Sequence, residues 1–253
     1  MDDELTDDAI AGDWRVIQRR RGHRYSLDDM ATAWEAARAR PHARRYLDLG
    51  CGIGSVLLMV GYKLRPERVV GIEAQRVSFE LACRNVARNG LDAELIEGDL
   101  REERLDERFD LITGTPPYFA PGTATPSPDA QRTYARIEMR GGIEDYLAAA
   151  ARALAPGGAF VACCDAKRPD RALEGAAAAG LAPVRRRDVV PRDGHKGPLF
   201  ALWTFEREGE LTVEPPLVAR DADGARTEAH HDLRRFFDLP VNRAEPASGG
   251  AAP

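Results

Sequence analysis

The chain has 253 residues, of which 43% are hydrophobic and 30% charged, and its formal net charge is −5. This length can bury one substantial core, and the hydrophobic share argues against wholesale disorder. No apolar run approaches the roughly 20 residues that a membrane-spanning helix needs, so we expect no membrane segment. The negative charge gives no overall attraction to nucleic acid, and such a partner would need a local basic patch.

The two ends of the chain lack a hydrophobic pattern. Residues 1–13 are acidic and unpatterned, and residues 242–253 contain few apolar side chains, so both ends are expected to be disordered. Residues 14–241 then form a single domain. An acidic N-terminus is the opposite of the basic start of a secretion signal, which predicts a cytoplasmic location.

Strand-like and helix-like segments alternate between these ends. This order predicts an α/β fold with a Rossmann-like, mostly parallel sheet of seven strands and helices on both faces. The first helix is expected to be capped by Asp28-Asp29 and to run to about Ala39, with further helices at 75–88 and 143–154. The expected strands are 45–49, 68–72, 93–97, 109–113, 159–164, 184–190 and 199–205.

The first expected strand ends in the most informative motif of the chain, Asp48-x-Gly50-x-Gly52-x-Gly54. Glycines accept the positive φ angles of a tight strand-to-helix turn and let a ligand contact bare backbone. The second strand ends at Glu73, where a carboxylate is well placed to hold two ribose hydroxyls. The pattern predicts a nucleoside-binding site at this edge of the sheet.

With Gly98-Asp99 after the third strand, this pattern resembles the class I S-adenosylmethionine-dependent methyltransferases. The resemblance implies S-adenosylmethionine as cofactor, with its ammonium group near Asp48 and its adenine near Asp99. Ala74 and Leu100 follow the two acidic positions and are further cofactor-binding candidates. A nicotinamide-binding oxidoreductase is the competing interpretation, but its usual Gly-x-Gly-x-x-Gly has no acidic residue two positions earlier.

The fourth strand leads into Thr115-Pro116-Pro117-Tyr118-Phe119. Two prolines stiffen this loop, so that the Thr115 side chain and the Pro116 carbonyl can face an amino group beside the flat ring of Tyr118. The loop resembles the Asn/Asp/Ser-Pro-Pro-Tyr/Phe motif of methyltransferases that modify adenine N6, cytosine N4 or glutamine amides. There, the first residue and the first proline carbonyl accept hydrogen bonds from the target amine. Thr115 departs from the usual Asn, which leaves the target open.

Three segments resemble bacterial tRNA1(Val) adenine-37 N6-methyltransferases: residues 18–29, the Pro-Pro loop with Arg136 and Glu138 downstream, and residues 211–228. The resemblance implies a tRNA substrate. It also implies that Tyr25, Ser26 and Asp28 lie near the methionine end of the cofactor.

An adenine in an anticodon loop must leave its stack to be methylated, and Tyr118 or Phe119 could then stack on it. Arg132, Arg136 and Arg140 recur every four residues and would share one face of a helix beside the site. A second candidate for phosphate binding is the run of three arginines Arg19, Arg20 and Arg21.

Other functions remain open at this point. The four cysteines show neither CxxC spacing nor histidine partners, so no metal site is expected. Methylation of another nitrogen, in a protein glutamine amide or a small-molecule amine, and a non-catalytic cofactor-binding RNA module are the alternatives. No feature of the sequence bears on the oligomeric state.

Overall fold

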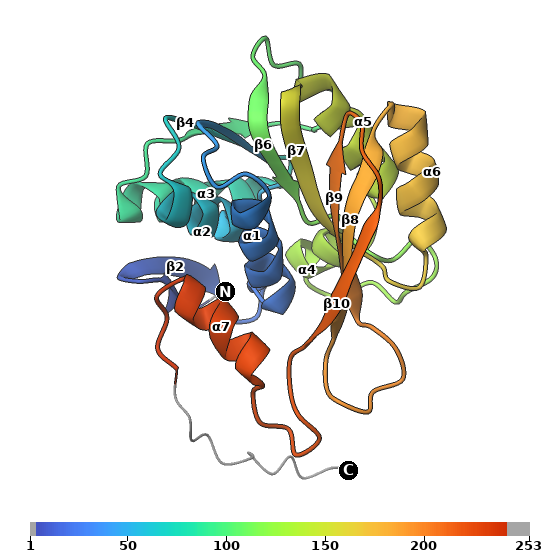
Figure 1. Cartoon of the computed structure of the whole chain (residues 1–253). Helices are drawn as coiled ribbons and strands as arrows, with labels where there is room; N and C mark the ends of the chain where they lie inside the picture. The colour runs from blue at the N-terminus through green and yellow to red at the C-terminus, as the bar shows by residue number, and fades with distance from the viewer. Residues whose placement is uncertain (1–3, 242–253) are drawn as a thin grey trace.

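The computed structural model describes residues 4–241. Its centre is an eight-stranded sheet with the order β10-β8-β9-β7-β6-β3-β4-β5 (Figure 1). β9 is antiparallel to β7 and β8, and the other neighbouring pairs are parallel. The strands are β3 (Arg45–Leu49), β4 (Arg68–Glu73), β5 (Glu94–Glu97), β6 (Phe109–Gly114), β7 (Leu154–Cys164), β8 (Ala182–Val190), β9 (Phe200–Glu206) and β10 (Thr212–Val218).

Helices cover both faces of this sheet, which confirms the predicted α/β class (Figure 1). One buried cluster lies between the sheet and α1, α2 and α3, and a second lies between the sheet and α5 and α6. The helices are α1 (Leu27–Ala39), α2 (Ser55–Leu64), α3 (Arg76–Asn89), α4 (Ala130–Arg136), α5 (Ile143–Ala153), α6 (Pro169–Ala179) and α7 (Glu228–Phe236).

The prediction of seven strands was wrong by one, because β10 adds a parallel strand beside β8 at the edge of the sheet. Pro215 and Pro216 lie inside β10 and gave its sequence the pattern of a loop. Proline lacks the N–H that a central strand must donate, but an edge strand has one side free of pairing. The register shifts between Glu214 and Leu217, where the two prolines stand.

The predicted disorder of residues 1–13 was also wrong over its described part. β1 (Leu5–Ala11) and β2 (Trp14–Arg19) form an antiparallel hairpin, and Ile10 is fully buried. The hairpin docks on α3, where the Asn85 side chain accepts a hydrogen bond from Ile17 N at 2.6 Å and donates to Ile17 O at 3.0 Å. The predicted disordered tail, residues 242–253, lies outside the described residues.

The residue that caps the first helix differs from the predicted Asp28-Asp29 cap. Ser26 is the N-cap of α1, and the Asp29 carboxylate accepts a hydrogen bond from Ser26 N at 2.8 Å. This reciprocal capping box places Asp29 inside the first turn, where its side chain is buried. Among helices of the described chain, none combines the length and apolar character that crossing a membrane requires.

Candidate active site

Two cavities lie at the carboxyl edge of the parallel strands. The first, which we call the inner cavity, is lined by the glycine turn after β3 and by residues that follow β4, β5 and β6. The second, the outer cleft, is lined by residues 20–24, the Pro-Pro loop and α4. Crevices at the carboxyl ends of parallel strands are where open α/β sheets bind ligands.

The three motif glycines have different roles. A Cβ at Gly50 would meet the hydroxyl of Tyr146 at 2.2 Å, so this glycine makes room for a buried tyrosine of α5. Gly52 lines the inner cavity with φ of +58°, and a Cβ there would have no atom within 4 Å. Gly54 is the N-cap of α2 and does not line the cavity. Gly52 therefore supplies the open backbone that a ligand can approach.

Glu73 closes β4 and is held against the glycine turn. Its carboxylate accepts hydrogen bonds from Gly52 N at 2.9 Å and from Gln75 N at 2.6 Å. Burial raises the pKa of Glu73, and the two backbone hydrogen bonds partly offset this rise. Each carboxylate oxygen has a second lone pair, so Glu73 can still accept hydrogen bonds from the two hydroxyls of a ribose.

Two further carboxyl groups, Asp29 and Asp48, are buried nearby. Burial raises the pKa of each to about 7. Asp29 lines the inner cavity and accepts a hydrogen bond from the Ser55 hydroxyl at 2.7 Å. Asp48 lies behind the cavity wall, where Oδ1 accepts from the Thr113 hydroxyl at 2.7 Å and Oδ2 has no hydrogen-bond partner among the described residues. Both groups favour a cationic ligand, because a nearby positive charge stabilises the ionised carboxylate.

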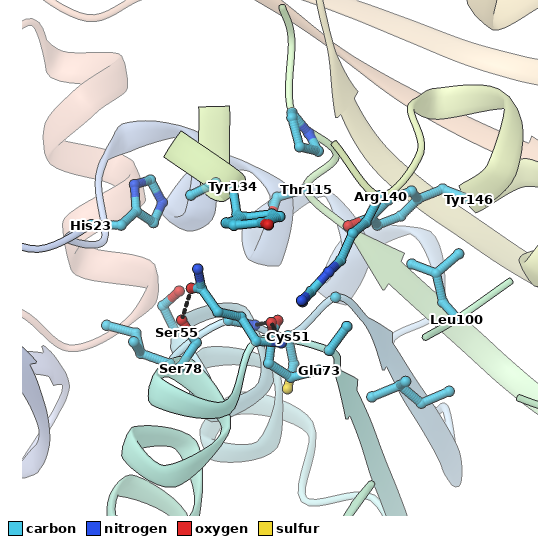
Figure 2. Close-up of a pocket in the computed structure, with 18 of the residues that line it drawn as sticks. His23, Cys51, Ser55, Glu73, Ser78, Leu100, Thr115, Tyr134, Arg140 and Tyr146 are labelled. Atoms are coloured by element: carbon cyan, nitrogen blue, oxygen red, sulfur yellow. Dashed lines mark hydrogen bonds between the residues drawn. The ribbon is translucent and has the colours of Figure 1, made fainter. Parts of the chain in front are cut away.

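Arg140 extends into the inner cavity from the segment after α4, toward Glu73 (Figure 2). Its guanidinium lies 4.7 Å from the ring centroid of Tyr134. Nη1 is buried without a hydrogen-bond partner in the described part of the chain. The prediction that Arg140 shares a helix face with Arg132 and Arg136 was wrong, because α4 ends at Arg136.

A buried guanidinium nitrogen without an acceptor indicates a donor that a ligand satisfies. We expect Arg140→Met to weaken S-adenosylmethionine binding about tenfold, since hydrogen bonds from charged groups contribute on the order of 1.5–3 kcal/mol. Isothermal titration calorimetry measures this affinity. Arg132→Met, on the exposed side of α4, is the matched control and should leave the affinity unchanged. Equal affinities in the two variants would contradict the expectation.

The outer cleft carries most of the predicted substrate-binding residues. Phe119 is 39% exposed, and the Arg136 guanidinium lies 5.5 Å from its ring centroid. Tyr118 is half-buried, and its hydroxyl donates to Asp28 Oδ2 at 3.3 Å and to Cys163 Sγ at 3.1 Å. The Tyr118 ring is thus anchored at its hydroxyl end, whereas Phe119 is the more exposed aromatic ring.

The predicted unpaired arginine run is largely neutralised. Arg19 pairs with Asp129 at 2.7 Å, and Arg20 pairs with Glu4 at 2.8 Å. Arg19 does not line the outer cleft, whereas Arg20 and Arg21 do. Across residues 4–241, Arg21 has no acidic partner within ion-pair distance.

The structure brings most of the predicted cofactor contacts together. The predicted residues that line the inner cavity are Tyr25, Gly50, Gly52, Glu73, Ala74, Asp99, Leu100, Thr115 and Pro117. Asp28 and Pro116 line the outer cleft instead, and Ser26 caps α1 outside both cavities. Asp99 is held by Arg101, whose hydrogen bonds lower its pKa.

Several lining residues were missed by sequence reasoning, among them His23, Asp29, Tyr134 and Tyr146. Only Asp29 had a local signal, because Ser26-x-x-Asp29 is a capping-box pattern. Within residues 4–241, no three His, Cys, Asp or Glu side chains gather as a metal site would require.

The inner cavity suits S-adenosylmethionine. Gly52 leaves backbone open to the ligand, Glu73 offers oxygens to the ribose, and Arg140 has a buried donor without an acceptor. The buried acids Asp29 and Asp48 suit a ligand that carries positive charge on its sulfonium and ammonium groups.

Comparison with known proteins agrees with this geometry. A family model described as the methyltransferase small domain matches residues 28–174, more than half of the chain. A tRNA1(Val) (adenine(37)-N6)-methyltransferase from Bacteroides thetaiotaomicron is 28% identical over 210 residues, covering 82% of this chain and 86% of the relative. A release factor glutamine methyltransferase from Geobacter sulfurreducens is 42% identical over 85 residues. That match covers 34% of this chain and only 30% of the relative.

Solved structures share the fold. A predicted O-methyltransferase from Agrobacterium tumefaciens superposes with a TM-score of 0.61 at 20% identity, covering 86% of this chain and all of the other. Solved chains with this fold also include complexes with S-adenosylmethionine. The chain therefore belongs to the methyltransferase small domain family and is an S-adenosylmethionine-dependent methyltransferase.

Proposed function

We propose that the protein methylates the N6 nitrogen of an adenine in tRNA. The observation that carries the proposal is the junction of the two cavities at Thr115, with the cofactor residues on one side and exposed aromatic and basic residues on the other. A relative named for this reaction aligns over 82% of the chain. A tRNA substrate would also place the activity in the cytoplasm.

The Pro-Pro loop provides the chemistry that an exocyclic amine requires. Thr115 lines both cavities, and its hydroxyl forms no hydrogen bond with the described residues. The Thr115 oxygen and the Pro116 carbonyl can each accept one N–H of the amine, which directs the nitrogen lone pair toward the inner cavity. S-adenosylmethionine supplies the methyl group when bound.

The outer cleft offers a base and its phosphates suitable contacts. A base turned out of its stack loses stacking energy, and the exposed Phe119 ring can recover about 1–3 kcal/mol of it. Arg132 and Arg136 lie on α4 along the same cleft and can neutralise phosphates.

The direct test is incubation with isotopically labelled S-adenosylmethionine and unmodified total tRNA, followed by digestion to nucleosides. We expect label in N6-methyladenosine. Label in another nucleoside would change the target atom, and label absent from RNA would refute the proposal.

A second candidate is methylation of a glutamine amide. The 42% identity to a release factor methyltransferase favours it, although that match covers 34% of this chain. A parallel reaction with purified release factors, analysed by peptide mass spectrometry, tests it. A methylated glutamine in the release factor, together with no label in the tRNA, would favour this candidate.

Thr115 offers a specific test of the amine-binding role. We expect Thr115→Val, which keeps the shape but removes the hydroxyl, to lower the methyl-transfer rate about tenfold, because one neutral hydrogen bond contributes about 1 kcal/mol or slightly more. S-adenosylmethionine affinity should stay within about twofold, since the valine keeps the side-chain volume at the cavity wall. Thr115→Asn, which restores an acceptor, should recover the rate. Equal loss of rate and of affinity in Thr115→Val would contradict the assignment.

A further inference from the structure

His23 lies where the inner cavity and the outer cleft meet. Four residues line both cavities: His23, Asp29, Thr115 and Ala135. Figure 2 shows the His23 side chain at the rim of the inner cavity, on the side opposite Arg140. A group at this junction can contact both the transferred methyl and the nitrogen that receives it.

The backbone around His23 is held firmly. His23 N donates to Gln131 Oε1 at 3.2 Å, and the Gln131 side chain donates in turn to the Ser78 hydroxyl at 3.1 Å. A Cβ at Gly22 would meet Gln131 Oε1 at 2.2 Å, so the glycine permits this close approach. The imidazole itself forms no hydrogen bond with any described residue.

Of the four shared residues, His23 and Asp29 carry a basic group, and the His23 imidazole is the one without a hydrogen bond to a described residue. Ala135 has no titratable group, and the Thr115 hydroxyl accepts hydrogen bonds but is too weak a base to hold a proton. Asp29 already accepts from Ser55 with Oδ1 and from Ser26 N with Oδ2. Both Asp29 oxygens already accept a hydrogen bond, whereas the His23 imidazole has both ring nitrogens free of hydrogen bonds to the described residues, and it is the base that we consider between the cavities.

We propose that His23 takes the proton that the target amine loses during methyl transfer, a role that rests on the proposed function. The amine nitrogen forms a bond to the methyl carbon as the carbon–sulfur bond breaks, and that electron pair stays on sulfur. In the same step one N–H bond breaks, its electron pair returns to nitrogen, and the proton moves to an imidazole nitrogen of His23. The imidazolium releases the proton to water through the outer cleft.

The surroundings keep the imidazole in its neutral, accepting form. Burial lowers the pKa of His23, Arg132 and Arg136 lower it further, and Asp28 acts in the opposite direction. An imidazole with a pKa below its ordinary value is neutral at pH 7 and becomes protonated as the pH falls. The charged residues that face it across the junction are Asp28, Asp29, Arg132 and Arg136, with Arg21 and Arg24 on its own segment.

Single-turnover methylation at saturating S-adenosylmethionine tests the role, because cofactor binding then does not limit the rate. We expect His23→Gln to lower the rate about 100-fold, as for loss of a general base. The fall in rate that His23 protonation causes at acidic pH should disappear in this variant. Added imidazole should restore part of the rate of His23→Ala and none of that of His23→Gln. His42→Gln, at an exposed histidine outside both cavities, is the control and should match the wild type.

The possible results separate a failure of the proposed function from a failure of the role of His23. Wild-type protein that forms no N6-methyladenosine would refute the proposed function and the proton transfer with it. If the wild type forms N6-methyladenosine and the rate of His23→Gln lies within about threefold of the wild-type rate, the role of His23 is refuted and the proposed function stands. A third result is that His23→Gln is slow while its rate still falls at acidic pH as in the wild type, and that imidazole fails to restore His23→Ala. Those two observations together would show a purely structural role for His23 and would also overturn the proposal.

Discussion

Replacing Gly52 with leucine should abolish S-adenosylmethionine binding while the protein still folds. A Cβ at this position meets no atom within 4 Å, so the leucine side chain would enter the inner cavity without colliding with the core. It would fill the space that the cofactor needs. We expect the affinity to fall at least about 100-fold, equivalent to roughly 2.7 kcal/mol or more.

The control for this variant is Gly90→Leu. Gly90 ends α3 with φ of +62°, close to the +58° of Gly52, and its Cβ would also meet open space. Both leucines carry the same backbone strain, about 1–2 kcal/mol, so the thermal unfolding temperature should fall by similar amounts in the two variants. Gly90→Leu should bind the cofactor normally. Normal binding by Gly52→Leu in calorimetry would mean that the cofactor does not lie over this turn.

Replacing Asp48 with asparagine should stabilise the free protein at alkaline pH and weaken cofactor binding. Burial raises the pKa of Asp48 from 3.8 to about 7, so the folded protein holds a proton that the unfolded chain has already released between these values. Stability is therefore lost as the pH rises from about 4 through 7. The cost of ionised Asp48 reaches up to about 4 kcal/mol at pH 8, and asparagine removes it.

The same charge favours the cofactor. An ionised carboxylate behind the cavity stabilises the positive sulfonium and ammonium groups, so affinity for S-adenosylmethionine should rise from pH 6 to pH 8. We expect Asp48→Asn to lose about tenfold in affinity at pH 8 and much less at pH 6, where Asp48 is mostly protonated.

Urea unfolding and calorimetry at pH 5, 6.5 and 8 measure both effects. The stability difference between variant and wild type should grow with pH. Asp223→Asn, an exposed acid that lines neither cavity, should show no such trend. A pH-independent difference for Asp48→Asn would contradict the raised pKa as its cause.

Sequence reasoning predicted most of the residues that line one side of the inner cavity, because their signals are local. The glycine turn, Glu73 and Asp99 each follow a strand directly, and parallel strands bring their carboxyl ends to one edge. The bounds of α3 and α5 were predicted within a residue or two, since Asn89-Gly90 closes the first helix and Pro156-Gly157-Gly158 follows the second. The resemblance to class I methyltransferases rested on these local motifs.

The errors involve contacts between distant segments. The acidic N-terminus looked disordered, but Asp7 pairs with Arg88 of α3 and Asp8 pairs with Arg24, so residues outside the hairpin offset part of its charge. Ion pairs also engage two arginines of the basic run that the sequence offered for phosphate binding, Arg19 with Asp129 and Arg20 with Glu4.

The amino-acid sequence by itself determined the α/β class and the strand ends that line the inner cavity, because period, glycine turns and strand-end acids are properties of neighbouring residues, and the resemblance of these motifs to a known family indicated the cofactor. Only the tertiary structure decided which side chains share the junction of the two cavities. His23, Asp29 and Thr115 come from separate elements and show no common spacing. They meet because α1, the segment before it and the loop after β6 pack against one another at the edge of the sheet.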